Sequence, residues 1–193
     1  MTDLINLACP QYFVSVDIKD ILYSAIAKFG KDKIRMEVIN DIEMSERRCN
    51  EILEECKKKM TNNLDDESFA NLCEALLHFM LTASLIPSER KVTWKGIELD
   101  LVIPSLKMLN KSPDKTLVIQ IIKGNEVVRK IKDAKSVQPH DVNIWTVSAK
   151  RLEVDHKNYY VGSSLFPYPR IIVDVNAFLA HKGNRGLKLL HGE

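Results

Sequence analysis

Hydrophobic residues recur every three or four positions along the first third of the chain, which is the spacing of helices that bury one face. Three ranges share this spacing: 17–29, 33–42 and 45–60. Gly30 is a natural stop after the first range, and the Ser45 hydroxyl can cap the third. The pattern therefore predicts an N-terminal helical region over residues 1–62.

A longer helix is predicted to open a second domain, which we place at residues 63–193. Polar turn formers, including an aspartate that can cap a helix, occupy residues 62–66. Residues 67–85 then carry a strongly apolar stripe. Pro87 ends this stripe, because the residue before a proline disfavours helical geometry.

After this helix the hydrophobic period changes to two residues, which indicates β-strands. Residues 91–95 and 97–103 flank Gly96 and are predicted to form a hairpin. Alternation in the second strand separates two sets of residues, with Ile97, Leu99, Leu101 and Ile103 on one face and Glu98, Asp100 and Val102 on the other. Residues 104–115 are predicted to be a connection that contains turn-forming residues.

Further strand and helix patterns follow, in the order strand, helix, strand, strand, strand: 116–123, 125–136, 142–148, 159–161 and 170–175. The first of these strands is almost entirely apolar, as a strand buried on both faces should be. The strand–helix–strand order implies a right-handed crossover and a parallel pair. Asn176 can cap a short last helix. The predicted fold class is therefore α/β (α+β), with a central mixed sheet flanked by helices.

Composition narrows the function classes only a little. The formal net charge is +2, so a nucleic-acid-binding surface, if one exists, must be local. The first twenty residues lack the pattern of a signal peptide, and no apolar stretch is long enough to span a bilayer, so we expect a cytoplasmic protein. The four cysteines form no Cys-x-x-Cys pair and lie at no zinc-finger spacing from a histidine, which favours buried thiols.

The order helix, hairpin, strand, helix, strand over residues 65–150 resembles the core of the PD-(D/E)XK superfamily, the restriction-endonuclease-like nucleases. The residues that carry the resemblance are Gly96-Ile-Glu-Leu-Asp-Leu-Val-Ile-Pro104 and Leu117-Val-Ile-Gln-Ile-Ile-Lys-Gly124. In that family the second hairpin strand supplies a metal-binding aspartate, and the third strand supplies an acid followed two positions later by a lysine. The first helix often adds a glutamate. The chain also resembles small hypothetical proteins of thermophilic archaea, and its many Ile, Lys and Glu residues would suit a heat-stable protein.

The resemblance implies a catalytic set of Asp100, Lys123 and Glu74. Asp100 and Glu74 would hold Mg²⁺, which lowers the pKa of a bound water and neutralises charge on the phosphodiester. Lys123 would orient the attacking water or stabilise the transition state. The implied fold is a restriction-endonuclease-like α/β domain that follows the N-terminal helices.

The third strand departs from the family pattern. Ile121 stands where the family has an acid, and an isoleucine cannot ligate a metal. Either Glu74 on the helix or Glu98 on the hairpin is a candidate for the missing carboxylate. Structural alternatives stay open: Asp100 and Lys123 can form a salt bridge, and Glu74 can pair with His78, four residues later on the same helix.

Basic residues follow the third and fourth strands, where the resemblance implies that a DNA or RNA backbone would run: Arg129, Lys130, Lys132, Lys150 and Arg151. A solvated helix face is the alternative interpretation. Three functions therefore stay open. They are a Mg²⁺-dependent nuclease, a catalytically inactive nucleic-acid-binding protein, and an assembly subunit whose helices over residues 12–60 bind a protein partner or a second copy.

Overall fold

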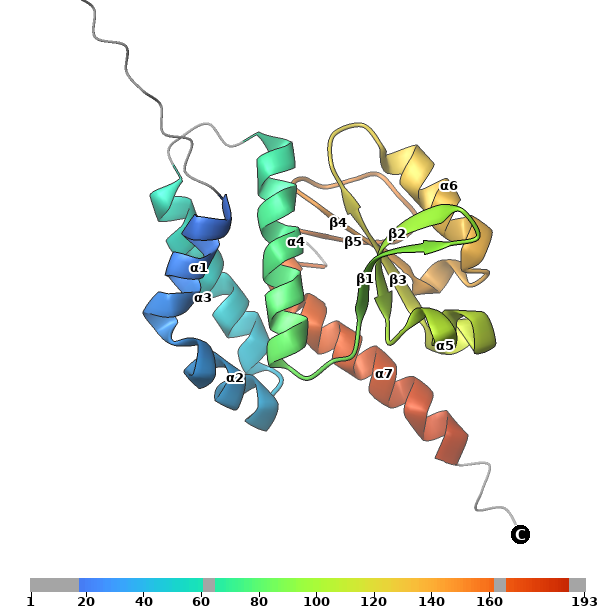
Figure 1. Ribbon diagram of the computed structural model, residues 1–193, viewed down its shortest axis with the longest axis horizontal. Helices are drawn as coiled ribbons and strands as arrows, with labels where there is room; N and C mark the ends of the chain where they lie inside the picture. Colours follow the sequence, from blue (N-terminus) through green and yellow to red (C-terminus); the bar gives the residue numbers. More distant parts are fainter. Residues whose placement is uncertain (1–17, 61–64, 162–165, 188–193) are drawn as a thin grey trace, which may run out of the picture.

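At the centre of the computed structural model, which describes residues 18–60, 65–161 and 166–187, is a five-stranded mixed sheet (Figure 1). The strands are neighbours in sequence order: β1 (Glu89–Trp94), β2 (Ile97–Ile103), β3 (Leu117–Ile122), β4 (Ile144–Ser148) and β5 (Lys157–Tyr160). β1, β2 and β3 pair antiparallel, and β3, β4 and β5 pair parallel. The predicted hairpin and the predicted parallel pair are both confirmed.

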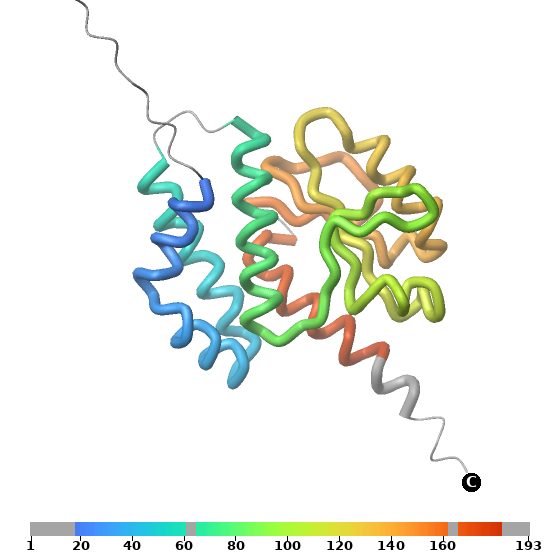
Figure 2. The backbone as a smooth tube through the Cα atoms, in the orientation of Figure 1, coloured from blue at the N-terminus to red at the C-terminus, as the bar shows by residue number. Residues whose placement is uncertain are grey.

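The N-terminal helices are α1 (Ile18–Phe29), α2 (Lys31–Asn40) and α3 (Met44–Lys59). They pack on one side of α4 (Asp66–Ala83), and the sheet lies on its other side, so α4 is the layer between them (Figure 1, Figure 2). The opposite face of the sheet is covered by α5 (Leu106–Lys111) and α6 (Val127–Val137). This arrangement brings one end of β3 close to both α4 and α6.

One hydrophobic cluster extends from the N-terminal helices through α4 to the sheet. It contains Ile52 on α3, Leu76 and Met80 on α4, and Ile121 and Val147 on the sheet, all of which are buried. A smaller cluster fills the space between the sheet and the helices α5 and α6. The division into residues 1–62 and 63–193 stays a prediction, but the two regions share a core.

The helix before the sheet begins as predicted, whereas the third helix does not. Asp65 caps α4, because its Oδ1 accepts a hydrogen bond from the Ser68 amide at 2.6 Å. Glu43, not Ser45, is the N-cap of α3, and Ser45 is buried within that helix. The preceding turn already satisfies the first amides, since the Asp41 carboxylate accepts from the Glu43 amide and the carbonyls of Asp41 and Ile42 accept from the amides of Met44 and Ser45. The predicted Ser45 cap is therefore wrong.

The tail was predicted as a strand over residues 170–175, and this prediction is wrong. The segment enters through the short helix η3 (Tyr168–Arg170) and forms the start of α7 (Ile171–Leu187), so Asn176 lies inside a helix. Buried Ile171, Ile172 and Val175 recur at helical spacing, and burial overrides their preference for strands. The Tyr168 hydroxyl fixes this start by donating to the Cys73 carbonyl at 2.6 Å.

Two other regions add detail that the sequence pattern left out. The predicted connection over residues 104–115 contains α5 and the short helix η1 (Pro113–Lys115), and η2 (Asp141–Asn143) precedes β4. Three cysteines, Cys49, Cys56 and Cys73, are buried free thiols as predicted, and burial raises the pKa of each. Cys9 lies outside the described residues. Within the parts of the chain that the structure describes, no helix is both long and apolar enough to span a bilayer.

Truncation of Leu76, the fully buried α4 residue between the N-terminal helices and the sheet, should destabilise the protein strongly. We expect Leu76→Ala to lower the free energy of unfolding by about 2–5 kcal/mol, because it leaves a cavity in the shared core. Urea denaturation followed by circular dichroism measures the change. Val128→Ala on α6, where the side chain is 80% exposed, is the matched control and should change stability by less than about 0.5 kcal/mol. Equal losses in the two variants would contradict the assigned core.

Candidate functional site

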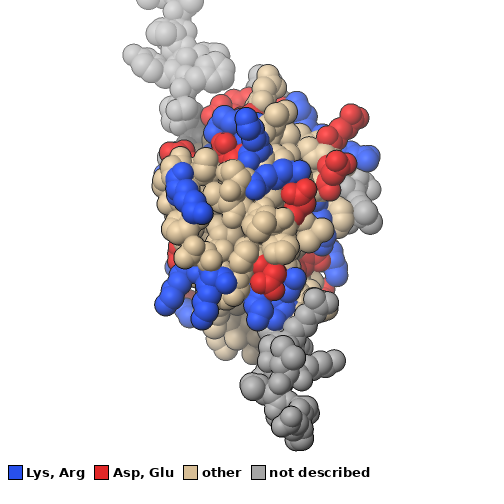
Figure 3. Space-filling model, turned by 90° about the vertical axis from the view of Figure 1, so that its right-hand side faces the viewer, with Lys and Arg blue, Asp and Glu red and all other residues tan. Residues whose placement is uncertain are grey.

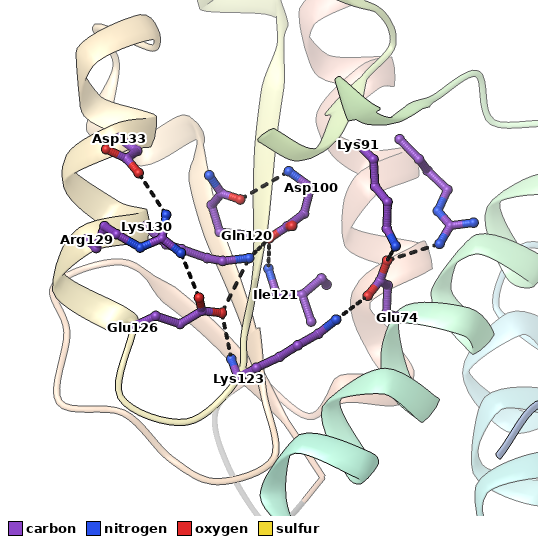
Figure 4. A network of polar contacts seen from close by, with 11 residues as sticks. Glu74, Lys91, Asp100, Gln120, Ile121, Lys123, Glu126, Arg129, Lys130 and Asp133 are labelled. Carbon is purple, nitrogen blue, oxygen red and sulfur yellow. Dashed lines mark hydrogen bonds and ion pairs between the residues drawn. The ribbon is translucent and has the colours of Figure 1, made fainter. Parts of the chain in front are cut away.

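Glu74 is the centre of a group of cations at the side of α4 that faces the sheet. Lys123 Nζ donates to its Oε2 at 2.8 Å, and Arg90 Nη2 donates to its Oε1 at 3.0 Å. Lys91 Nζ lies 3.6 Å from the same Oε1 (Figure 4). Burial raises the pKa of Glu74, but the bonds from Lys123 and Arg90 and the charge of Lys91 outweigh burial, so the pKa is lowered. Glu74 is therefore an ionised, well-neutralised carboxylate at neutral pH.

Asp100 lies where β2 and β3 separate. Regular pairing joins residues 101–103 to residues 117–119. Beyond it, the Asp100 amide donates to Gln120 Oε1 at 3.2 Å, and the Ile121 amide donates to Asp100 Oδ2 at 2.7 Å. These side chains replace the backbone bonds that a continued ladder would supply, and they hold the Asp100 carboxylate against β3 at the point where the ladder ends.

The predicted alternation of β2 fails at the same point. Leu99 and Leu101 are two positions apart and would share a face of a regular strand. Instead, Leu99 packs in the cluster beneath α6, and Leu101 packs in the cluster beneath α4. Lys91 stands opposite the break and has a left-handed backbone conformation, with φ of 48°. The break in the strand, not simple alternation, sets the direction of Asp100.

Lys130 on α6 supplies the cation for Asp100. Its Nζ lies 2.5 Å from Asp100 Oδ2 and 3.5 Å from Glu126 Oε1, so one ammonium group lies between two carboxylates (Figure 4). Glu126 Oε1 also accepts a hydrogen bond from the Lys123 amide at 3.3 Å. Burial raises the pKa of Glu126, but the Lys130 charge and the hydrogen bond from Arg129 outweigh it and lower the pKa.

Glu126 is one of the site residues that the family pattern does not predict. It precedes α6 directly, three residues after Lys123 and four before Lys130. An acid at the start of a helix with a lysine four residues later was a usable signal. The family pattern places its acids on the strands and on the first helix, so it does not predict an acid at the start of the helix that follows β3.

The two predicted metal ligands are held by different cations. Glu74 binds Lys123, Arg90 and Lys91, whereas Asp100 binds Lys130, and Ile121 lies between the two carboxylates (Figure 4). In residues 18–60, 65–161 and 166–187, no group of three or more His, Cys, Asp or Glu side chains is placed to hold a metal ion. In this arrangement the residues do not fit a Mg²⁺ ion, whose ligands would first have to leave their ammonium partners.

The ion pairs also distinguish between the alternative partners of Asp100, Lys123 and Glu74. Lys123 pairs with Glu74 and not with Asp100, so the alternative of an Asp100–Lys123 salt bridge is not realised. The Glu74 carboxylate takes lysine and arginine partners rather than His78. The Glu98 side chain is exposed on β2 and forms no ion pair with another described residue.

The predicted nucleic-acid-binding residues divide into neutralised and available cations. Arg129 binds Glu126 and Asp133, Lys130 binds Asp100, and Lys150 lies 2.6 Å from Asp66. Lys132 and Arg151 are exposed and form no ion pair with another described residue. Figure 3 views the side of the molecule that carries α5 and α6, and there acidic and basic side chains are interspersed around an uncharged centre. The positive surface is therefore weaker than the sequence suggested.

No protein-family model and no curated protein sequence matches the chain. Solved structures do match. The restriction endonuclease PspGI in complex with substrate DNA is similar over 86% of this chain and 94% of that chain, with a TM-score of 0.59 and 12% sequence identity. Metal-depleted Ecl18kI in complex with uncleaved, modified DNA covers 86% of this chain and 80% of its own, with a TM-score of 0.48 and 8% identity.

The fold of the protein follows from the first of these matches and from the topology. The chain has the restriction-endonuclease-like fold, a mixed five-stranded sheet flanked by helices and preceded by N-terminal helices. The resemblance to the PD-(D/E)XK fold is thereby confirmed at the level of architecture. At 12% identity the likeness concerns the fold, and the roles of the site residues rest on the contacts described above.

The lowered pKa of Glu74 makes its contribution to stability depend on pH. Because the folded-state pKa lies below the ordinary value of 4.5, this contribution is present above that value and is lost as the pH falls through the folded-state pKa. We expect Glu74→Gln to lose less stability than wild type between about pH 7 and about pH 3. Urea denaturation at several pH values measures the difference. Glu98→Gln, which alters an exposed carboxylate, is the control and should retain the wild-type pH profile.

Proposed function

We propose that the protein binds nucleic acid on a restriction-endonuclease-like scaffold and does not hydrolyse it, because lysine ammonium groups neutralise the carboxylates that a metal ion would need. The observation that carries this proposal is the position of Lys130 between Asp100 and Glu126. The pairing of Lys123 with Glu74 supports it, since the second predicted ligand is also occupied.

The chemistry of phosphodiester hydrolysis explains why this arrangement disfavours cleavage. A bound divalent cation lowers the pKa of a water molecule and so generates the nucleophile at neutral pH. An ammonium group neutralises nearby carboxylates but offers no vacant coordination position for water. Ile121 adds no ligand in the place where the family pattern has an acid. The site therefore neutralises its carboxylates with ammonium groups, which do not activate water.

Binding is supported by the fold and by two available cations. The PspGI structure with the same fold is a complex with substrate DNA. Lys132 on α6 and Arg151 after β4 are exposed and without ion-pair partners among the described residues, so they are available for phosphate oxygens. Phosphate contacts read no sequence, and such binding weakens steeply as salt rises. Both DNA and RNA are therefore suitable ligands to test.

Two other functions have a specific observation in their favour. A Mg²⁺-dependent nuclease is favoured by the closeness of Asp100 and Glu126, whose carboxylates lie within reach of one ammonium group and would form a pair if Lys130 moved away. An assembly subunit is favoured by exposed hydrophobic side chains on α1 and α2: Tyr23, Met36 and Ile39. A second copy or a protein partner could then bind the N-terminal helices.

The proposal is tested by measuring binding and cleavage of the same labelled duplex DNA, single-stranded DNA and RNA. We expect binding that weakens with salt, and no cleavage with Mg²⁺ or Mn²⁺. The double variant Lys132→Glu, Arg151→Glu should weaken binding by at least about tenfold, because two phosphate contacts become repulsive. Lys107→Glu, on the exposed side of α5, is the control and should bind as wild type does.

Cleavage that is abolished by Asp100→Ala would overturn the proposal in favour of the nuclease. Absence of binding to all three nucleic acids would overturn it as well. Elution as a dimer, lost on substitution of Met36 and Ile39 by serine, would then favour the assembly subunit.

Replacement of Lys130 tests directly whether its ammonium group takes the place of a metal ion. In Lys130→Ala, Asp100 and Glu126 lose their shared cation, and we expect the free energy of unfolding to fall by about 1–3 kcal/mol. Addition of Mn²⁺ should raise the melting temperature of this variant and leave that of wild type unchanged, because only the variant has free carboxylates. Lys135→Ala, which breaks the exposed pair with Asp141, is the control. An equal effect of Mn²⁺ on wild type would contradict the assigned role of Lys130.

A further inference from the structure

A basic groove of about 910 Å³ lies among α1, α2, α4 and the start of β1, outside the network around Asp100. Its charged lining residues share one sign: Lys19, Lys31, Arg35, Arg90 and Lys91. None of the described residues that line it is Asp or Glu. A groove of this size matches the volume of a small-molecule site, and its charge selects an anion.

The cations on α2 are the available part of this groove. Lys31 and Arg35 stand one helical turn apart, both are exposed, and neither forms an ion pair with another described residue. Lys31 begins α2, so the positive end of that helix adds to the local potential. Arg90 and Lys91 share the single carboxylate of Glu74 on the other side. Mutual repulsion among these cations is relieved when an anion binds between them.

Aromatic and apolar groups lie beside the cations. Tyr23 on α1 is 66% exposed although it is a large aromatic side chain, and Phe79 on α4 lines the same groove. Leu85, just after α4, is 59% exposed there as well. A flat heterocycle can stack on an exposed tyrosine ring, and such stacking does not depend on base identity. Cations and an aromatic surface in one groove suit a ligand that carries both phosphate and a base.

We propose that this groove binds a nucleotide, with the phosphates on Lys31, Arg35 and Lys91 and the base against Tyr23. The nucleotide is either free or the 5′-phosphorylated end of a single strand, since both present the same chemistry. The proposal does not rest on the function proposed above, because α1 and α2 supply its main contacts and Lys132 and Arg151 take no part.

The test is isothermal titration of the full chain with ATP, with inorganic tripolyphosphate and with a 5′-phosphorylated trinucleotide. Arg35→Glu should weaken ATP binding by at least about tenfold, because it replaces a phosphate contact by repulsion. Lys33→Glu is the matched control, since it changes the same charge on the same helix at an exposed residue that does not line the groove, and it should weaken binding by less than about threefold.

The base contact is tested separately from the phosphate contact. Tyr23→Ala should weaken ATP binding by about five- to tenfold and leave tripolyphosphate binding unchanged. Met36→Ala, an exposed hydrophobic residue of α2 outside the groove, is the control for this variant. Thermal melting confirms that each variant is folded, and Arg35→Gln replaces Arg35→Glu if the latter is unstable.

Competition identifies the source of the nucleotide. If the trinucleotide displaces ATP and Arg35→Glu weakens both, a strand end is the ligand, and if only ATP binds, a free nucleotide is. The proposal is overturned if neither binds up to about 1 mM. It is also overturned if Lys33→Glu and Arg35→Glu weaken binding equally, or if Tyr23→Ala weakens tripolyphosphate as much as ATP. These outcomes are independent of the Lys132→Glu, Arg151→Glu result, so the two proposals can fail separately.

Discussion

Partly buried carboxylates require neighbouring cations, and this requirement organises the part of the sheet around the carboxyl end of its central strand, β3. Removing a carboxylate from water is unfavourable unless charge and hydrogen bonds compensate it. Glu74 on α4 pairs with Lys123 at the end of β3, Asp100 on β2 pairs with Lys130 on α6, and Glu126 pairs with Lys130 and Arg129 of the helix that it precedes. The two lysines therefore join α4 to β3 and α6 to β2, at the point where the strands separate.

The sequence predicted the scaffold well because the scaffold depends on periodicity. The apolar stripe of α4, the almost entirely apolar β3 and the change from a helical to a strand period are local signals, and they set the order of the elements. The segment over residues 170–175 was predicted to be a strand because it is rich in β-branched residues, but it is helical. Its helix is decided by burial against α3 and α4 and by the Tyr168 hydroxyl on the Cys73 carbonyl, which no local pattern contains.

Three residues that the sequence predicts for the site lie close together, but the ion pairs that they form were not predicted. Asp100, Lys123 and Glu74 do lie around the end of β3, yet which lysine binds which carboxylate depends on the break in β2 at Asp100. Alternation assumes a regular strand, and Leu99 and Leu101 show that this strand is not regular. Lys130 was assigned to a nucleic-acid surface because the sequence shows only its charge. Its position against Asp100 depends on how α6 packs on the sheet, which the sequence does not show.

The first strand of the sheet also limits how copies of this protein can meet. β1 is an outer strand of the sheet, and an outer strand can recruit a strand from another chain. Here it carries Arg90 and Lys91, Lys95 follows it in the hairpin turn, and the backbone at Lys91 and Lys95 is left-handed. Like charges and kinks at such positions oppose the addition of another strand, as in natural proteins that avoid aggregation. The edge nearest the ion network is thus protected from self-association through β-strands.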